Sequence, residues 1–405
     1  MIHACVVGLG GRGYGLLRHV LLKNEDIIVD AVCDLYEDRV ARAVDAVKAV
    51  GMTDVKGFSD YKEALNTKGL DAVFVFTDWS THAQIAIYAM KKGIAVASEV
   101  GCEYTLENCY NLVRTQEATG TPYMFMENCC WGKEELLATA MARKNLFGTI
   151  VHCSGAYGHD LRREVSYGHV NRHYRFDNYK NRNCENYPTH ELGPIAKLLN
   201  INRGNRILTV SSFASKAEGL KEYVQTRADA TEEMKNTVFK QGDIVTTVLT
   251  CAGGETILLN LDTTLPRSYS RAFTVRGTKG MYEQNTHSVY MDGGKEGWDP
   301  AAYYREAIGN AAAYEAEYLP GCWKNVTPEA LAAGHGGMDW HAYKAFTDAL
   351  QKKEAMPIDV YDGATWQAVA VLSEMSIQQG GAPQAMPDFT NGAWFKRPSK
   401  DVCDL

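Results

Sequence analysis

The first 128 residues alternate between short apolar runs and segments in which apolar residues recur every three or four positions. Recurrences such as Leu17, Val20 and Leu21 predict helices, and uninterrupted runs such as AVFVF predict strands that are buried on both faces. The expected strands cover residues 4–7, 27–33, 55–58, 72–76, 94–97 and 123–126. Strands that alternate with helices form a parallel sheet with right-handed crossovers. We therefore expect an α/β domain with a Rossmann-type parallel sheet over residues 1–128.

The pattern changes after about residue 130. A helix is expected at residues 133–144, and a polar stretch rich in Arg, His, Asn and Tyr runs from residue 157 to residue 190. Long strands with few helices between them are expected at residues 149–156, 207–213, 244–251, 256–262, 272–277 and 288–291. Helices at residues 340–352 and 364–378 close the chain. This pattern predicts a second domain of the α+β class over residues 129–405, with a mostly antiparallel sheet.

Composition limits the class of protein. The chain has 405 residues, of which 45% are hydrophobic and 22% are charged, as in ordinary globular proteins. No apolar run approaches the roughly 20 residues that span a bilayer, and no leader precedes the first strand, so we expect a cytoplasmic protein without a membrane partner. The net charge of −7 and the lack of a basic block argue against nucleic-acid binding. Eleven cysteines without CxxC spacing favour reduced thiols over a disulfide framework.

A glycine-rich turn follows the first strand and opens the first helix. The sequence from Gly8 to Gly13 fits G-x-G-x-x-G, which lets a pyrophosphate approach the backbone at a helix N-terminus. Asp34 ends the second strand, 21 residues after Gly13, where an acidic residue is expected to bind a ribose. Its charge repels a 2′-phosphate and favours NAD over NADP, whereas Arg12 argues for a phosphate contact. The structural alternative is a plain strand–helix turn with Asp34 as a helix cap.

Further motifs extend this pattern to about residue 339. They lie at residues 10–13, 77–82, 99–100, 127–129, 155–160, 186–190, 202–204, 266–270 and 334–339. In this order they resemble the Gfo/Idh/MocA family of NAD(P)-dependent sugar oxidoreductases. Within it, the chain is similar to glycoside hydrolase family 109, whose known activity is NAD-dependent α-N-acetylgalactosaminidase. The resemblance implies a cofactor site made of Gly8, Gly10, Gly11, Arg12, Gly13, Asp34, Trp79, His82, Glu99, Val100 and Asn128.

The resemblance also implies a reaction. Ordinary sugar dehydrogenases of this superfamily carry Glu-Lys-Pro after the fifth strand, and the lysine handles the proton of the oxidised hydroxyl. Here the sequence is Glu99-Val100-Gly101, so another base is required. In family 109, oxidation at sugar C3 acidifies the C2 proton, elimination expels the C1 substituent, water adds, and C3 is reduced again. Cofactor NAD⁺ is regenerated within each turnover, and the glycoside is hydrolysed.

Site residues follow from the same resemblance. His190 deprotonates the 3-hydroxyl, which suits an imidazole that titrates near neutrality. Tyr157 abstracts the C2 proton. Glu127 and His159 bind or polarise hydroxyls and assist the leaving oxygen. The expected substrate-binding residues are Tyr187, Tyr269, Arg175 and Thr189. One departure stands beside the active histidine, because the family's His-Gly-Leu-Gly is His190-Glu191-Leu192-Gly193 here.

Other interpretations remain open at this point. A sugar dehydrogenase would use the same site for net hydride transfer, and a non-catalytic protein would only sense NAD and a sugar. A metal site would draw on His152, His159, Asp160, His169 and His173, but these lack a known ligand spacing and no metal is expected. His335 and Asp339 are expected to shape a glycine loop and to cap the helix that follows. The superfamily resemblance further implies a homo-oligomer.

Overall fold

The computed structural model describes residues 1–293 and 305–405. These residues form two compact units. Unit 1 comprises Met1–Trp131 and Asn325–Thr365, and unit 2 comprises Gly132–Lys324 and Trp366–Leu405. A single boundary near residue 128 therefore misses the segment 325–365, which folds with unit 1. In α16 (Met338–Lys352), the rings of Tyr343 and Phe346 lie 5.8 and 5.6 Å from the ring of Phe74, so aromatic packing draws this segment onto the unit 1 sheet.

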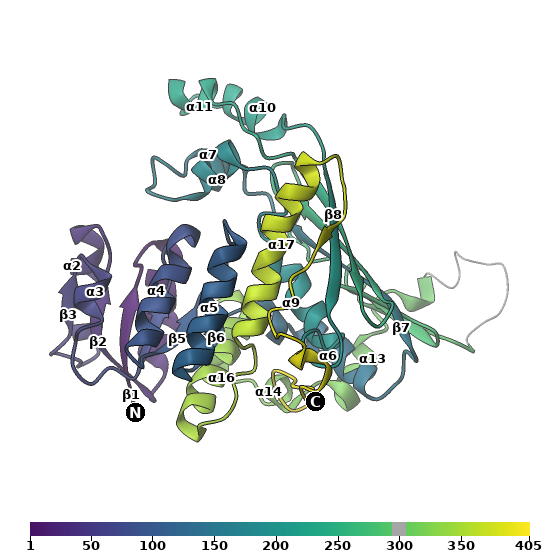
Figure 1. Cartoon of the computed structure of the whole chain (residues 1–405), viewed down its shortest axis with the longest axis horizontal. Coiled ribbons are helices and arrows are strands. Elements are labelled where there is room, and N and C mark those ends of the chain that lie inside the picture. Colours follow the sequence, from purple (N-terminus) through teal and green to yellow (C-terminus); the bar gives the residue numbers. More distant parts are fainter. Residues whose placement is uncertain (294–304) are drawn as a thin grey trace. The chain divides into compact units, whose positions relative to one another are not determined.

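Unit 1 is built on a six-stranded parallel sheet in the order β3-β2-β1-β4-β5-β6, in the purple and blue part of Figure 1. The strands are β1 (Ile2–Val7), β2 (Ile27–Cys33), β3 (Lys56–Phe58), β4 (Ala72–Val75), β5 (Ala95–Ser98) and β6 (Tyr123–Phe125). Every neighbouring pair is parallel, so the expected Rossmann-type sheet is confirmed. The strand order reverses at β1, and ligands of such sheets bind beside the carboxyl ends of the strands at this point.

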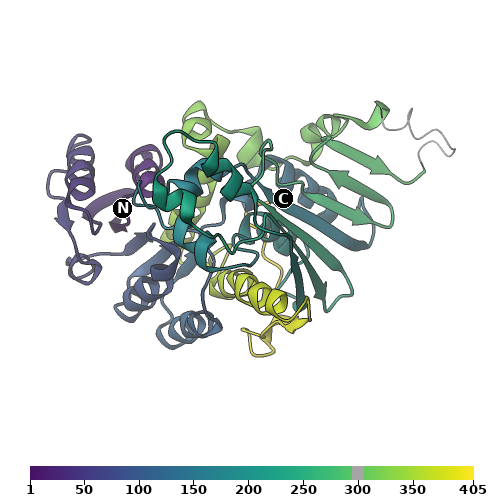
Figure 2. The same cartoon turned by 90° about the horizontal axis from the view of Figure 1, so that it is seen from above.

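Helices cover both faces of the unit 1 sheet (Figure 2). The helices of unit 1 are α1 (Gly11–His19), α2 (Glu37–Lys48), α3 (Tyr61–Ala64), α4 (Trp79–Lys91), α5 (Leu106–Thr119), α15 (Pro328–Ala332) and α16, with the start of α17 (Val360–Gln378). Asp60, Asp78 and Thr105 cap α3, α4 and α5, because each side chain accepts a hydrogen bond from a backbone N–H of the first turn. Among the described residues, no helix has the length and hydropathy needed to cross a membrane.

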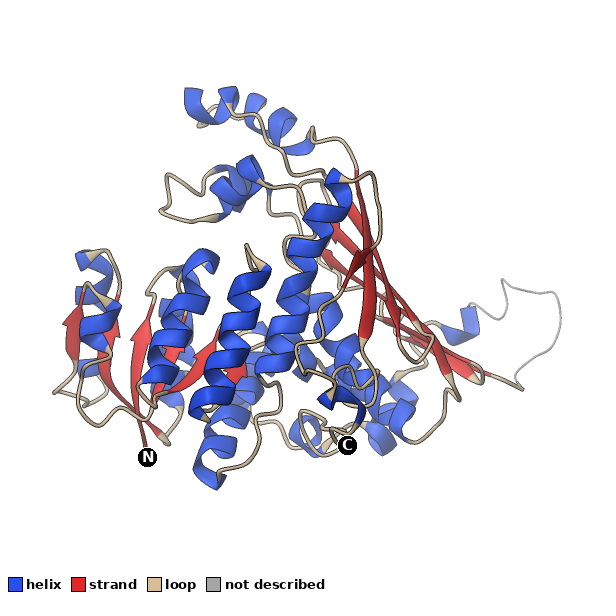
Figure 3. Ribbon diagram, viewed as in Figure 1, coloured by secondary structure: helices blue, strands red, loops and turns tan. Residues whose placement is uncertain are grey.

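Unit 2 contains an eight-stranded sheet in the order β13-β12-β11-β7-β10-β9-β8-β14, drawn in red in Figure 3. The strands are β7 (Ile150–Gly158), β8 (Ile207–Ala214), β9 (Ile244–Cys251), β10 (Thr256–Asp262), β11 (Thr274–Gly277), β12 (Gly280–Glu283), β13 (Ser288–Met291) and β14 (Gln384–Ala385). Only β7 and β10 pair in parallel, so the mostly antiparallel sheet is confirmed. The sequence did not predict β12 and β14, and β14 is only two residues long.

Helix α9 (Thr189–Leu198) packs on β7 in unit 2. A Cβ added at Gly155 would lie 2.9 Å from the Cβ of Glu191 and 3.3 Å from Ile195, so this glycine allows the close approach. The other helices are α6 (Lys133–Arg143), α7 (Arg162–Ser166), α8 (Arg175–Asn181), α10 (Gly219–Gln225), α11 (Glu232–Asn236), α13 (Ala312–Tyr318) and α14 (Gly321–Lys324). The polar stretch at residues 157–190 thus contains α7, α8 and the start of α9.

Candidate active site

The glycine-rich turn joins β1 to α1 in unit 1. Gly8 has a φ of +98°, and a Cβ there would lie 2.4 Å from the carbonyl carbon of Phe76. A Cβ at Gly13 would lie 2.1 Å from the carbonyl oxygen of Gly8, so both positions require glycine. A Cβ at Gly11 would meet nothing within 4 Å, which leaves open space beside the first turn of α1. The first N–H groups of a helix have no partner within the helix, so this turn fits the pyrophosphate of a dinucleotide.

Asp34 braces this turn from the end of β2. Its Oδ2 accepts the backbone N–H of Leu9 at 2.7 Å, and its Oδ1 accepts that of Tyr36 at 3.1 Å. The guanidinium of Arg39 lies 3.6 Å from the same carboxylate. Helix α2 begins after Tyr36 and has no side-chain cap. The alternative role of Asp34 as a helix cap is therefore wrong, and its carboxylate lies beside the turn, as ribose binding requires.

Arg12 is held by a cluster of polar groups within unit 1. Its Nη1 and Nη2 donate to the two carboxylate oxygens of Asp339 at 2.7 and 2.8 Å, and Nη2 lies 3.3 Å from Glu99. Asp339 also accepts from the Nδ2 of Asn128 at 2.7 Å and lies 2.9 Å from the Nδ1 of His335. We call these five residues the Arg12 cluster. The cluster contains three predicted cofactor residues, Arg12, Glu99 and Asn128. The carboxylate of Asp339, which the sequence had suggested as a helix cap, hydrogen-bonds to Arg12 and Asn128.

Asp339 is fully buried at the start of α16. Burial alone would raise the pKa of this carboxyl, but hydrogen bonds from Arg12 and His335 outweigh burial and hold the pKa well below its usual value. The expectation that Asp339 caps α16 is wrong, because Gly337 precedes the helix and no side chain caps it. The glycine loop itself is confirmed, since Gly334, His335, Gly336 and Gly337 all have positive φ.

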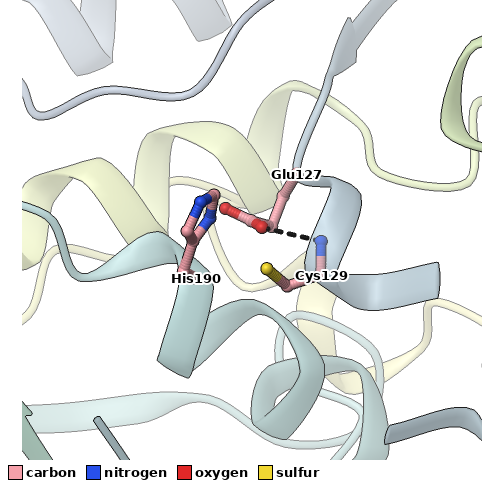
Figure 4. Close-up of side chains that lie close together, drawn as sticks. All are labelled: Glu127, Cys129 and His190. Carbon is pink, nitrogen blue, oxygen red and sulfur yellow. Dashed lines mark hydrogen bonds between the residues drawn. The ribbon is translucent and has the colours of Figure 1, made fainter. Parts of the chain in front are cut away.

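The remaining unit 1 candidates are buried around the carboxyl ends of the strands. Burial lowers the pKa of His82, which keeps the imidazole neutral, and its Nε2 lies 3.0 Å from the carbonyl oxygen of Thr77. Trp79 packs against Gly101, where a Cβ would lie 2.6 Å from the indole. Val100 is buried. Glu127 is fully buried, and its Oε1 accepts the backbone N–H of Cys129 at 3.0 Å (Figure 4).

A cluster of aromatic rings in unit 2 joins the end of β7 to the start of α9. The rings of Tyr157 and Tyr187 lie 4.6 Å apart, and that of His190 lies 5.4 and 4.7 Å from them. The ring of His159 lies 5.2 Å from that of Tyr269, and its Nδ1 lies 3.4 Å from the Tyr157 hydroxyl. We call these five residues the substrate-side cluster. The structure thus brings together five candidates that the sequence separates by more than a hundred residues.

Two further candidates adjoin this cluster. The Arg175 guanidinium lies over the ring of Tyr187 at 5.0 Å and pairs with Glu164 at 3.0 Å. Burial would lower the pKa of Arg175, but the facing Tyr157 and Glu164 raise it well above its usual value, so Arg175 is a permanent cation. Thr189 is fully buried in the first turn of α9, and its hydroxyl has no hydrogen-bond partner within the described part of the chain.

His159 differs from Arg175 in its charge. Burial lowers the pKa of His159, Glu164 opposes this shift, and the positive charge of Arg175 adds to it. The imidazole is therefore neutral at pH 7 and is able to accept a proton or a hydrogen bond.

A buried carboxyl pair lies next to His190 in the chain and was missed by the sequence reasoning. Glu191, the residue that departs from the family pattern, is 1% exposed, and Glu185 is fully buried. The side chain of Glu191 interacts with that of Glu185 and partly opposes the effect of burial on the pKa of Glu185. Burial raises the pKa of Glu185 to about 8, so the pair holds a proton at pH 7. Glu191 was visible as an irregular residue, but nothing in the sequence pointed to Glu185 as its partner.

The residues of the metal alternative have other partners. His152 lies 2.8 Å from the hydroxyl of Thr256, and Asp160 pairs with Arg162 at 2.6 Å. In residues 1–293 and 305–405, the five proposed ligands do not converge on one point. The structure therefore gives the metal alternative no support.

Comparison with known proteins assigns a protein family to each part of the chain. The description "Oxidoreductase family, NAD-binding Rossmann fold" matches residues 2–126, and "Glycosyl hydrolase 109, C-terminal domain" matches residues 131–396. A glycosyl hydrolase family 109 protein of Stenotrophomonas maltophilia is 40% identical over 98% of this chain and 90% of its own. An α-N-acetylgalactosaminidase of Tannerella forsythia is 33% identical over 98% of this chain and 88% of its own.

Solved structures share the fold at much lower identity. Levoglucosan dehydrogenase in complex with NADH and levoglucosan has a TM-score of 0.70 at 16% identity, covering 96% of this chain and 100% of that one. Scyllo-inositol dehydrogenase from Lactobacillus casei with NAD(H) has a TM-score of 0.66 at 12% identity, covering 95% and 99%. The match to the NAD-binding Rossmann fold includes the turn at Gly8 and Asp34. The chain therefore belongs to glycosyl hydrolase family 109 and is an NAD-dependent glycosidase on an oxidoreductase fold.

Proposed function

We propose that this protein hydrolyses a terminal N-acetylgalactosaminide or a related hexoside in the cytoplasm, by transient oxidation at C3 and elimination between C1 and C2. The relative from Tannerella forsythia supports this sugar class. The observation that carries the proposal is the substrate-side cluster. Its acid–base groups are the phenol of Tyr157 and the imidazoles of His159 and His190, next to the cation of Arg175. Direct displacement by an ordinary glycosidase instead uses two carboxyl groups.

Each residue of the cluster has a role in this proposal. Bound NAD⁺ supplies a reversible hydride acceptor for sugar C3. His190 takes the proton of the 3-hydroxyl, because a neutral imidazole is a general base near pH 7. Tyr157 removes the C2 proton as a phenolate, which the charge of Arg175 stabilises. His159, Tyr187, Tyr269 and Thr189 bind the sugar hydroxyls, and Glu127 assists the leaving oxygen.

The cofactor-binding roles in unit 1 are part of the same proposal. The turn from Gly8 to Gly13 binds the pyrophosphate, and Asp34 binds the adenosine ribose. Arg12, Glu99 and Asn128 shape the turn through Asp339, and Trp79, His82 and Val100 line the cofactor side. Mass spectrometry of the nucleotide released by acid from purified protein tests this assignment. Recovery of NAD supports it, and recovery of mainly NADP would refute the role of Asp34.

Hydrolysis in D2O tests the mechanism. The C2 proton passes through an ionisable side chain that exchanges with solvent, so deuterium should appear at C2 of the released sugar, with the hydrogen at C3 largely retained and no NADH accumulating. Direct displacement at C1 breaks neither bond, so hydrolysis without C2 exchange would overturn the proposal. Net formation of NADH from a free sugar would instead indicate a dehydrogenase.

We also propose a homo-oligomer that forms through the outer face of the eight-stranded sheet. Phe213 on β8 is 57% exposed and Val248 on β9 is 37% exposed, although both are large apolar residues on strands. Sedimentation of the wild type and of Val248→Glu tests this interface. A wild-type oligomer that the substitution dissociates supports it, and a monomeric wild type would exclude it.

A further inference from the structure

Two cysteines of unit 2 face each other across a long stretch of sequence. The Sγ atoms of Cys322 in α14 and Cys403 in the C-terminal tail lie 3.9 Å apart, and the two residues are 81 positions apart in the chain. Both are partly exposed, whereas the other nine cysteines are buried. An oxidant in solution therefore reaches these two thiols more easily than any of the others.

Cys322 also differs from the buried thiols in its electrostatics, whereas the hydrogen bond with Cys322 and burial raise the pKa of Cys403. The hydrogen bond with Cys403 lowers the pKa of Cys322, and the backbone N–H of Trp323 adds to this effect against the opposing effect of burial. Burial instead raises the pKa of thiols such as Cys5 and Cys109 well above the usual value. Cys322 thus combines partial access to solvent with a lowered thiol pKa, and both properties favour cysteine oxidation.

We propose that Cys322 and Cys403 are an oxidation site, at which a peroxide converts the two thiols into a disulfide. The thiolate of Cys322 attacks one peroxide oxygen, the O–O bond breaks, and Cys322 becomes a sulfenic acid while the other oxygen leaves as water. The sulfur of Cys403 then attacks the Cys322 sulfur, the S–S bond forms, and the sulfenic oxygen leaves as a second water. Two thiols lose two electrons and two protons, and one peroxide is reduced to two waters.

The disulfide would strengthen an existing attachment of the tail. Asp401 pairs with Arg143 of α6 at 2.8 Å, and Arg143 also donates to the carbonyl oxygen of Leu198 at 2.8 Å. The hydroxyl of Ser399 lies 2.7 Å from the side chain of Asn200. Leu198 and Asn200 lie at the end of α9, the helix that begins with Thr189 and His190. A disulfide to Cys322 of α14 would therefore fix a tail whose Asp401 and Ser399 already bind Arg143 and Asn200.

The loop that this disulfide closes is long. Between Cys322 and Cys403 the chain leaves unit 2 at Asn325 and returns at Trp366. Cross-links that close long loops restrict the unfolded chain most, so a large effect on thermal stability is expected in the chain-entropy account. The oxidation site thus links the redox state of the surroundings to the stability of unit 2.

Thiol counting on the intact protein tests the site. Reduced protein should show eleven thiols after denaturation, and limited treatment with hydrogen peroxide should remove two of them. Peptide mapping should then find Cys322 linked to Cys403. Cys322→Ser and Cys403→Ser should each abolish the linked peptide, whereas Cys109→Ala, at a buried thiol, should still form it. Loss of thiols spread over the buried cysteines, or no linked peptide at peroxide levels that oxidise them, would overturn the proposal.

Thermal unfolding tests the consequence. The oxidised wild type should melt at least about 3 °C above the reduced wild type, on the scale of stabilisation by a long-loop disulfide. The double variant Cys322→Ser, Cys403→Ser should melt at one temperature with and without peroxide. Equal melting temperatures of the oxidised and reduced wild type, with the linked peptide present, would refute the role of the bond in holding the tail.

Discussion

The two units hold their polar groups in opposite ways. In unit 1 the Arg12 cluster is held by ion pairs and hydrogen bonds. Asp339 accepts hydrogen bonds from Arg12 and Asn128 at 2.7–2.8 Å. In unit 2 the substrate-side cluster is a set of rings, with centroids 4.6–5.9 Å apart and mostly edge-to-face or tilted. Ion pairs and hydrogen bonds therefore position the side chains of the Arg12 cluster, and ring packing positions those of the substrate-side cluster.

This difference matches the two tasks. A cofactor that is restored in each turnover needs a fixed cradle, and charge-assisted hydrogen bonds supply rigidity. Groups that transfer protons must gain and lose them near neutrality, and a strong ion pair prevents this by moving the pKa far away, as at Asp339. Ring packing orients Tyr157, Tyr187 and His190. The comparison predicts that catalysis will depend on unit 2 and stability on the unit 1 charges.

The largest effect is expected at the substrate-side cluster. Tyr157→Phe and His190→Ala should each lower kcat by at least about a hundredfold, which is the usual scale for losing a general acid or base. NAD binding and the melting temperature should change little, because the Arg12 cluster is intact. Steady-state kinetics with a chromogenic α-N-acetylgalactosaminide, together with titration of NAD, measures both quantities.

Tyr282→Phe is the matched control for this prediction. Tyr282 is a buried tyrosine of the same sheet, on β12, and has no role in the proposed reaction. It should leave kcat within about threefold, as expected for a substitution far from the reacting atoms. Near-normal kcat in both Tyr157→Phe and His190→Ala would show that the ring cluster is structural.

Some features of unit 1 could be predicted from local sequence, and others could not. The strands of unit 1, the turn at Gly8 and the position of Asp34 at the end of β2 are confirmed, because apolar periodicity and glycine spacing report on single elements. The Arg12–Asp339 pair joins residues 327 positions apart. Such a pair depends on the path of the whole chain, and no local pattern encodes it.

The carboxyl pair shows the same limit within unit 2. Glu191 lies in the first turn of α9, where an acidic residue is ordinarily favourable for the helix dipole, so its burial against Glu185 left no local signal. The segment 325–365 was likewise assigned by its position after the second-domain strands. The packing of its aromatic side chains on Phe74 and the hydrogen bonds of Asp339 with Arg12 join it to unit 1.

The second prediction tests the charge cluster. Asp339→Asn keeps the shape of the side chain but removes its charge, which should lower the free energy of unfolding at pH 7 by about 2 kcal/mol, the scale of charge-assisted hydrogen bonds at a partly exposed arginine. The folded state depresses the pKa of Asp339, so its contribution is present above about pH 4 and is lost as the pH falls. The difference between variant and wild type should therefore shrink in acid.

Urea unfolding at pH 7 and pH 3.5 measures this difference. Asp348→Asn is the control on the same helix, because Asp348 pairs with Lys344 at 2.6 Å on the surface. Exposed pairs of this kind contribute about 0.3–0.5 kcal/mol, so the control should change little. Equal effects of the two substitutions would contradict the contrast between the units.

The third prediction concerns the pH dependence of stability at the carboxyl pair of Glu185 and Glu191. Burial raises the pKa of Glu185 to about 8, so the folded protein keeps a proton that the unfolded chain releases above about pH 4.3. Between these two values the folded state binds more protons, and its stability falls as the pH rises, by at most about 1.4 kcal/mol per pH unit for one proton. Glu185→Gln replaces the protonated carboxyl with a neutral donor of the same shape and removes this dependence. The variant should therefore gain stability relative to the wild type as the pH rises from 5 to 8, in unfolding titrations measured at each pH.

Glu218→Gln, at a surface glutamate that pairs with Lys221 at 3.0 Å, should show no such trend. A constant difference between Glu185→Gln and the wild type across this range would mean that the pair holds no extra proton, and both units would then stabilise their buried carboxylates as charges.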